Sequence, residues 1–252
     1  MADIDLRVMR IARAVARAQM AGGARAAVLT GSHVSGRAHA HSDIDLVVVA
    51  GADAWSGSLH RDGFLVTLAT RTPARVRAGF RDPRRVGTYV PGWREAVILA
   101  DPSGVAARLQ AKAWRWSWDD VADACDAWVA DEVIGWAEEV HKLVGAMAAG
   151  DELLMATQRS LLALQLAGVM AVRRRILFGT ENVMWDLVAE ALGARWRRAQ
   201  RAALAMRGES LEVSCRAALR LYALAAEEAW DLLDRRQRQV VDHACAIAGE
   251  WV

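Results

Sequence analysis

The chain begins with apolar residues that recur at intervals of three and four. The apolar positions are Ile4, Val8, Ile11, Val15 and Ala18. Four arginines between positions 7 and 17 occupy a different face of the same helical period. Gly22-Gly23 follows and is typical of a helix end. The pattern predicts an amphipathic helix over the first twenty residues.

Short β-branched and apolar runs follow, separated by turn residues. The predicted strands are Ala26–Thr30, Ile44–Val49, Phe64–Ala69 and Ala96–Ala100. Thr72-Pro73 and Asp101-Pro102 each have the pattern of an N-cap followed by the first helical residue. They predict two helices, the second over Val105–Ala113.

The pattern changes after about Trp114, because no proline occurs beyond Pro102 and helix-forming residues dominate. The predicted helices run from a cap at Ser117 to about Met147, then over Asp151–Phe178, Glu181–Leu192, Arg195–Met206 and Glu209–Val252, the last with a break near Asp234. We therefore expect an α/β (α+β) domain with a short mixed sheet over residues 1–113. An all-α helical bundle over residues 114–252 follows it.

Composition excludes several classes of protein. Apolar residues make up 54% of the 252 residues and charged residues 25%, which excludes disorder. The net charge of +2 gives no whole-chain attraction for nucleic acid or an anionic membrane, so neither partner is expected. The three cysteines, Cys125, Cys215 and Cys245, form no close pair, and the longest apolar run is too short to span a bilayer. We expect a cytoplasmic protein.

One motif carries chemistry: Gly31-Ser32 at the end of one strand and Asp43-Ile44-Asp45 at the start of the next. Side chains two residues apart on a strand share a face, so Asp43 and Asp45 point together. Two adjacent carboxylates repel each other unless a cation lies between them, and Mg²⁺ typically takes one or two carboxylates. Gly31-Ser32 offers exposed N–H groups and a hydroxyl to phosphates. The combination predicts Mg²⁺-assisted nucleotidyl transfer.

An aspartate pair alone is common on a solvated strand face. Here Asp43 and Asp45 precede the apolar run Leu46–Ala50, which indicates the start of a buried strand. The loop before them also contains His33, His39 and His41, but no cysteine or spaced partner completes a metal site there.

The residues Leu29-Thr30-Gly31-Ser32 and Ser42-Asp43-Ile44-Asp45-Leu46 resemble the signature of the DNA-polymerase-β-type nucleotidyltransferase superfamily. The segment 98–104 resembles the one that closes this domain in antibiotic nucleotidyltransferases. The helical half, especially 128–143 and 164–180, is similar to the kanamycin (aminoglycoside) nucleotidyltransferase family. The resemblance covers most of the chain.

This resemblance implies further site residues. The family uses a helix-borne glutamate as general base and a lysine one turn later on the nucleotide phosphates, and Glu138 and Lys142 fit that pair. Glu132 and Glu139 are competing bases, and an exposed surface ion pair is the alternative interpretation. Ser35 and Arg37 are candidate phosphate contacts, or residues of a solvated loop.

The sequence departs from the superfamily at one position. Members usually carry a third carboxylate on the strand Phe64–Ala69, where the pattern places Thr67 and no acid occurs. Asp62 and His60 lie just upstream as substitutes. The absence of this third carboxylate weakens a second metal site. An alternative interpretation is therefore a degenerate nucleotidyltransferase that acts as a nucleotide-binding or regulatory module.

The expected function is Mg²⁺-dependent transfer of a nucleoside monophosphate, AMP from ATP, to a hydroxyl of a small acceptor such as an aminoglycoside-like antibiotic. A toxin-type enzyme that modifies RNA or protein is a further alternative. The resemblance also implies a homodimer that completes each site with residues of both subunits. Eleven tryptophans favour such an interface, unless they fill a junction within the chain. The arginines at 173–175, 195, 197, 198 and 201 are expected on solvated helix faces, where they would favour an acidic partner.

Overall fold

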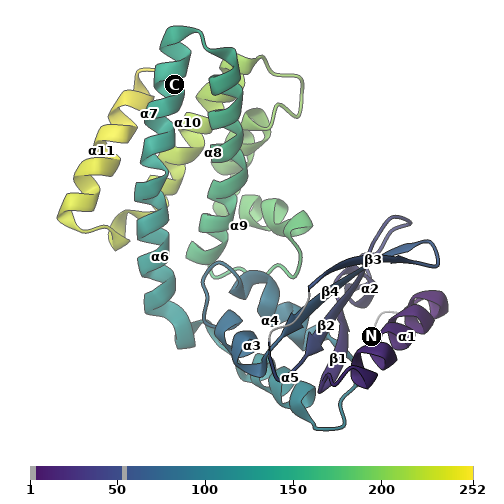
Figure 1. Ribbon diagram of the computed structural model, residues 1–252. Coiled ribbons are helices and arrows are strands. Elements are labelled where there is room, and N and C mark those ends of the chain that lie inside the picture. The colour runs from purple at the N-terminus through teal and green to yellow at the C-terminus, as the bar shows by residue number, and fades with distance from the viewer. Residues whose placement is uncertain (1–3, 53–55, 252) are drawn as a thin grey trace. The chain divides into compact units, whose positions relative to one another are not determined.

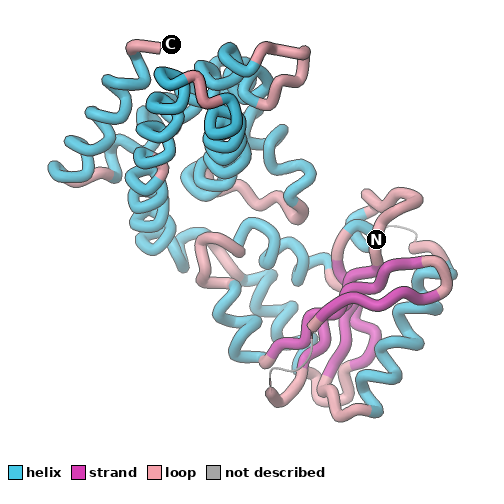
Figure 2. The backbone as a smooth tube through the Cα atoms, turned by 45° about the horizontal axis from the view of Figure 1, so that its top comes forward, coloured by secondary structure: helices cyan, strands magenta, loops and turns pink. Residues whose placement is uncertain are grey.

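The computed structural model describes residues 4–52 and 56–251. The chain divides into two compact units, one of residues 1–120 with 177–180 and one of residues 121–176 with 181–252. Strands occur in the first unit and the second is helical (Figures 1 and 2). The predicted combination of a mixed sheet followed by a helical region is confirmed. The composition-based division at residue 113 falls inside a helix that ends at Arg115.

The first unit is built on a five-stranded sheet. The strands, in sheet order, are β3 (Gly57–Arg61), β4 (Phe64–Arg71), β2 (Ile44–Val49), β1 (Ala26–Thr30) and β5 (Val97–Ala100). β2 and β4 are parallel, and the other neighbours are antiparallel. β3 is absent from the sequence prediction because it is a polar, largely exposed edge strand that lacks an apolar run.

Helix α1 (Leu6–Ala21) buries its apolar face against one face of this sheet. Val8, Ile11 and Val15 pack with Leu46 and Val48 in one cluster of buried side chains. Asp5 caps the helix, since its carboxylate accepts a hydrogen bond from the backbone N–H of Arg7. The predicted helix is confirmed from Leu6 onward, and residues 1–3 lie outside the described part of the chain.

Four further helices belong to the first unit: α2 (Ser32–Ser35), α3 (Pro73–Gly79), α4 (Val86–Glu95) and α5 (Val105–Arg115). The Thr72 cap is confirmed, because its hydroxyl accepts from the N–H of Arg75. The predicted helix at Val105 is confirmed, since α5 begins there, but its N-cap is Gly104, at φ +67°, and not Asp101. The Asp101 carboxylate accepts a hydrogen bond from the N–H of Ala107 in the first turn. No pattern predicted α4, which contains Pro91.

The second unit is a bundle of helices. They are α6 (Ala122–Gly135), α7 (Ala137–Ala149), α8 (Glu152–Arg173), α9 (Glu181–Ala203), α10 (Leu211–Ala229) and α11 (Arg235–Gly249), with short 3₁₀ turns η1 (Trp118–Val121) before α6 and η2 (Trp230–Leu232) before α11. The break near Asp234 is confirmed, since Asp234 forms a capping box at the start of α11. Val252, where the last helix was expected to end, lies outside the described residues.

Helix α8 ends before the predicted Phe178. Arg175 adopts φ +55°, which no right-handed helix accommodates, and residues 177–180 join the first unit. There the backbone N–H of Phe178 donates to the carbonyl of Gly87. By length and composition, α8 is the one helix of the described residues that passes as a membrane span. It packs in the bundle against α7, α9 and α10.

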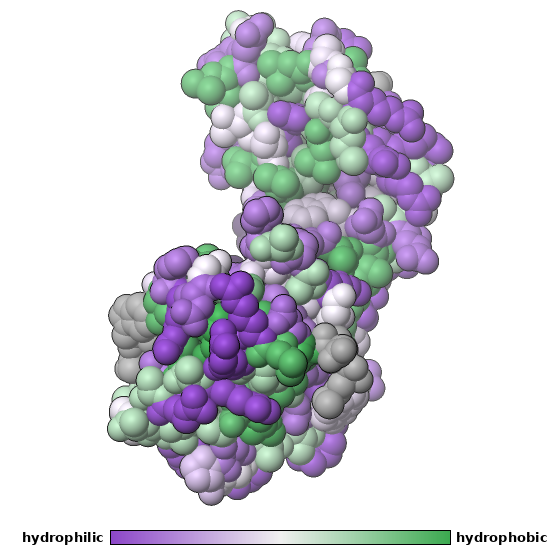
Figure 3. Space-filling view, turned by 90° about the vertical axis from the view of Figure 1, so that its right-hand side faces the viewer, coloured by the Kyte–Doolittle hydropathy of each residue, from purple (hydrophilic) through white to green (hydrophobic). Residues whose placement is uncertain are grey.

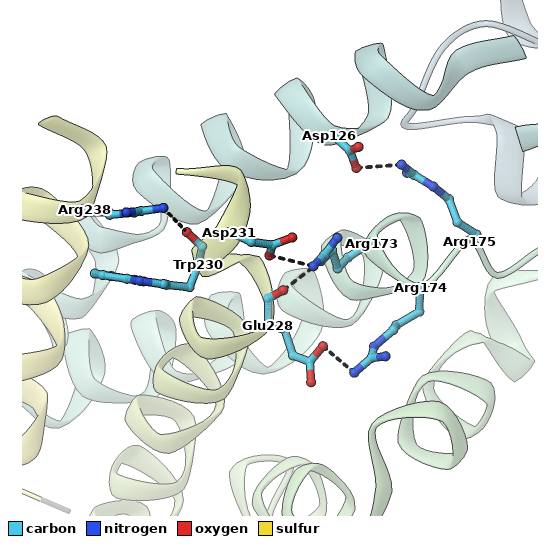
Figure 4. A network of polar contacts seen from close by, with 8 residues as sticks. All are labelled: Asp126, Arg173, Arg174, Arg175, Glu228, Trp230, Asp231 and Arg238. Atoms are coloured by element: carbon cyan, nitrogen blue, oxygen red, sulfur yellow. Dashed lines mark hydrogen bonds and ion pairs between the residues drawn. The ribbon is translucent and has the colours of Figure 1, made fainter. Parts of the chain in front are cut away.

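The three arginines at the end of α8 all form ion pairs within the second unit. Arg173 and Arg175 are half-buried, so the predicted solvated face is wrong for them, whereas Arg174 is exposed as predicted. Arg173, Arg174 and Arg175 form ion pairs with Asp231, Glu228 and Asp126 at 2.7, 2.5 and 2.6 Å, respectively (Figure 4). Arg173 also donates through Nε to the carbonyl of Glu228. These contacts tie the end of α8 to α6, to α10 and to η2.

Burial of β2 yields a stability prediction. Leu46 is 2% exposed in the core cluster, whereas Leu65 on β4 is 50% exposed. Leu46→Ala is expected to lower the free energy of unfolding by about 2–5 kcal/mol, because it removes packed methyl groups and leaves a cavity. Urea denaturation measures this loss. Leu65→Ala is the control, with a change within about 0.5 kcal/mol; equal losses would contradict the placement of β2.

Candidate functional site

The predicted aspartates lie at the start of β2, between two other strands. Asp45 pairs with Thr30 of β1 on one side and with Thr67 of β4 on the other. Ile44 and Leu46 are buried on the α1 side of the sheet, so the alternation of the strand places Asp45 on the opposite face. Asp43 directly precedes β2 and, like Asp45, is half-buried.

Gly31 brings the backbone against the Asp45 carboxylate. It follows Thr30 at the end of β1 and adopts φ +78°, a conformation that favours glycine. A Cβ atom at this position would overlap Oδ2 of Asp45. Position 31 therefore requires glycine for two independent reasons, and the structure brings Gly31 and Asp45 together as the motif predicts.

Ser32, Ser35 and Arg37 lie in the one-turn helix α2 and directly after it. Ser35 Oγ donates to the carbonyl of Ser32 at 3.3 Å, and the backbone N–H of Arg37 donates to the same carbonyl at 3.0 Å. Gly36, at φ +72°, ends the turn. The Arg37 side chain is exposed. These hydrogen bonds fold the segment after Gly31 into a short turn.

Thr67 occupies the position of the expected third carboxylate. Its Oγ1 donates a hydrogen bond to Oδ1 of Asp45 at 2.6 Å. Neither upstream substitute lies on β4: His60 pairs with Leu65 from β3, and Asp62 forms the tight turn between the two strands at φ +50°. A hydroxyl thus fixes the orientation of Asp45 where the superfamily resemblance implies a further acid.

Burial raises the pKa of Asp45 above its usual value, because it removes the carboxylate from water. The Thr67 hydrogen bond lowers that pKa, the neighbouring Asp43 charge raises it, and His33 lowers it by a smaller amount. Asp45 therefore carries a charge that its surroundings compensate only in part, which is the environment that a cation would relieve.

His33 is a buried residue of the site, whereas the sequence presented it only as one of three loop histidines. It lies on α2 directly after Gly31-Ser32, is 9% exposed, and contacts Phe64 edge-to-face at 6.3 Å between ring centroids. Its Nε2 atom is buried without a hydrogen-bond partner among the described residues. The only available signal was its position immediately after the Gly-Ser turn. His39 and His41 are exposed.

The donor set fits Mg²⁺ better than a soft metal. No group of three or more His, Cys, Asp or Glu that could hold a metal occurs in residues 4–52 and 56–251. Two carboxylates without a nitrogen or sulfur cluster are the hard ligands that Mg²⁺ accepts, with its other positions left for water and phosphate oxygens. Asp43 and Asp45 are the residues that would hold it.

Glu138 and Lys142 lie on α7 in the second unit and contact each other. Lys142 Nζ is 2.8 Å from Glu138 Oε1 and 3.2 Å from Glu139 Oε1. The hydrogen bond from Lys142 lowers the pKa of Glu138, which is an exposed side chain. Glu132, on α6, accepts a hydrogen bond from the Trp136 indole at 3.2 Å. All three candidate bases thus have a partner in their own unit.

The fold is that of nucleotidyltransferase-like proteins. A nucleotidyltransferase-like protein from Exiguobacterium sibiricum 255-15 is similar in structure, with a TM-score of 0.50 and 11% sequence identity over 97% of this chain and 89% of that chain. No protein-family model and no curated protein sequence matches the chain. The similarity defines the fold, and the relationship to the kanamycin family stays a prediction.

The raised pKa of Asp45 predicts how its removal affects stability. A carboxylate whose pKa is higher in the folded state destabilises that state as pH rises through that pKa. Asp45→Asn keeps an acceptor for Thr67 and removes the charge. Without divalent cations, we expect this variant to melt at a higher temperature than the parent at pH 7. The difference should disappear as pH falls below about 3.9, the ordinary pKa of Asp.

Differential scanning fluorimetry from pH 3 to pH 7 measures this effect. Asp186→Asn, an exposed position on α9, is the matched control and should follow the parent at every pH. A lower melting temperature for Asp45→Asn at pH 7 would mean that the carboxylate stabilises the fold, contrary to the burial argument.

Proposed function

We propose that the protein is a Mg²⁺-dependent nucleotidyltransferase that moves a nucleoside monophosphate, AMP from ATP, to a hydroxyl group of a small acceptor. The observation that carries this proposal is the half-buried carboxylate of Asp45 beside Asp43, against a glycine whose missing side chain lets the backbone approach. The similarity in fold to a nucleotidyltransferase-like protein supports it.

Each residue has a role in this proposal. Asp43 and Asp45 would hold the cation, which would supply positive charge to neutralise the negative charge of the phosphates. Thr67 keeps Asp45 in one orientation through its hydrogen bond. Gly31 and Ser32 offer backbone N–H groups and a hydroxyl to the phosphates. Ser35 and Arg37 are further candidate phosphate contacts on the same turn.

Glu138 is proposed as the general base, with Lys142 on the phosphates. Glu138 takes the proton of the acceptor hydroxyl, the hydroxyl oxygen bonds to the α-phosphorus, and the bond to the β-phosphate oxygen breaks to release pyrophosphate. Their ion pair must separate for Lys142 to bind phosphate. Glu139 and Glu132 remain alternative bases, and Glu139 is the more buried of the Lys142 partners.

The proposal also includes the acceptor molecule and the oligomeric state. An aminoglycoside-like antibiotic is the acceptor that the kanamycin-family resemblance implies, and a homodimer with sites shared between subunits is the assembly. Exposed Leu6 and Trp114, 87% and 63% exposed, offer apolar surface for an interface. Figure 3 shows green apolar areas between hydrophilic side chains on the face that it displays. A toxin-type acceptor, RNA or protein, is the alternative.

Nucleotide binding tests the catalytic centre directly. We expect the parent to bind ATP with Mg²⁺ at least about tenfold more tightly than the Asp43→Asn/Asp45→Asn protein. Without Mg²⁺ the two should differ little, because the aspartates act through the cation. Isothermal titration calorimetry with EDTA and Mg²⁺ arms measures this. If the parent binds no better than the double variant, the proposed function is wrong; binding without turnover would instead favour the degenerate, regulatory alternative.

Mixed dimers test the shared site. Asp43→Asn chains and Glu138→Gln chains are each expected to be inactive alone. If each site combines residues of two subunits, a mixed dimer regains one working site out of two, because one site then contains neither substitution. Transfer of labelled AMP to an aminoglycoside panel measures recovery after co-refolding. Absence of recovery in a mixture shown to contain mixed dimers would place both residues in one chain's site.

A further inference from the structure

Helices α9 and α10 enclose a hollow of about 470 Å³ within the second unit. Its floor consists of small and apolar side chains, among them Ala199 and Leu224. Three arginines also line the hollow: Arg195 and Arg198 from α9, and Arg220 from α10. The lining carries one acid, Glu227, so the hollow has a net positive charge.

The arginines around the hollow are less fully paired with acids than those at the end of α8. Arg173 and its two neighbours each pair with an acid (Figure 4). Arg195 pairs with Glu227 at 3.2 Å, at the rim of the hollow. Arg198 and Arg220 are exposed and have no hydrogen bond or ion pair to any described residue. Two guanidinium groups on facing helices are thus available to a ligand.

The size of the hollow favours a small molecule over a protein partner. Small-molecule sites typically measure about 300–1,000 Å³. A stable protein interface covers about 800 Å² on each partner and needs some 20–30 residues, far more than line this groove. Guanidinium groups bind phosphate through paired N–H donors, whereas an apolar floor favours a flat or apolar body.

We propose that this groove binds a phosphorylated small molecule, with the phosphate between Arg198 and Arg220 and an apolar or aromatic portion on the floor around Ala199. The inference depends on α9 and α10 alone and not on the proposed transferase activity. Arg195 is already paired with Glu227, which leaves Arg198 and Arg220 to the ligand.

The experiment uses the full-length Asp43→Asn/Asp45→Asn protein in EDTA, so that the proposed nucleotide site does not contribute. Phenyl phosphate, inorganic phosphate and benzoate are titrated by calorimetry. We expect phenyl phosphate to bind more tightly than either of the other probes. Arg198→Gln/Arg220→Gln should weaken it by about tenfold or more, because two charge-assisted contacts are lost. Ala223→Leu, at a half-buried position of the lining, should weaken phenyl phosphate and spare inorganic phosphate.

Arg201→Gln is the matched control, since Arg201 is an exposed arginine of α9 outside the hollow. It should leave the affinity for phenyl phosphate within about twofold. Equal losses for Arg201→Gln and for Arg198→Gln/Arg220→Gln would overturn the proposal, as would failure of phenyl phosphate to bind. If the double glutamine variant does not fold, Arg198→Lys provides the test: it keeps the charge, loses the paired donors and should bind more weakly than the parent.

Discussion

The candidate site depends on one close approach, that of the Gly31 backbone to the Asp45 carboxylate. It is possible because β1 ends with Thr30 in register with Asp45 and because residue 31 has no side chain. On the other side, β4 places the Thr67 hydroxyl on the same carboxylate. Three strands thus fix one charged group at the edge of an apolar core. The resulting loss of hydration raises the pKa of Asp45 above its usual value.

Local patterns predicted the elements that position this group. The period of Val8, Ile11 and Val15 predicted α1, and the β-branched runs predicted β1 and β2, since each of these signals lies within a few consecutive residues. The exceptions have physical causes. β3 is polar because it lies at the sheet edge, and α8 stops early because the chain leaves the bundle at Arg175 to pack Phe178 against Gly87. Both causes are contacts or positions in the folded chain, and the spacing of apolar residues along a short segment does not report them.

The residues of the candidate site also fall into those that local sequence predicts and those that depend on contacts between distant segments. Gly31, Asp43 and Asp45 were predictable because their spacing along one hairpin is itself the signal. The role of Thr67 depends on the register between β2 and β4, strands separated by more than a dozen residues, so the sequence identified the missing acid but not the hydrogen bond that replaces it. The burial of His33 depends on contact with Phe64 of a distant strand. A loop histidine has no periodicity from which burial can be inferred.

The arginines show why composition alone does not assign function in the helical unit. The sequence gives Arg173–Arg175 and the arginines of α9 the same interpretation, a solvated helix face. In the structure the first group is neutralised by Asp126, Glu228 and Asp231, so these charges are part of the bundle's own packing. Arg198 and Arg220 face a hollow floored by small side chains and lack such acids. Arginines that pair with acids within the fold contribute to its stability. Around the hollow, three arginines outnumber the single acid Glu227, and the resulting positive potential favours binding of an anion from solution.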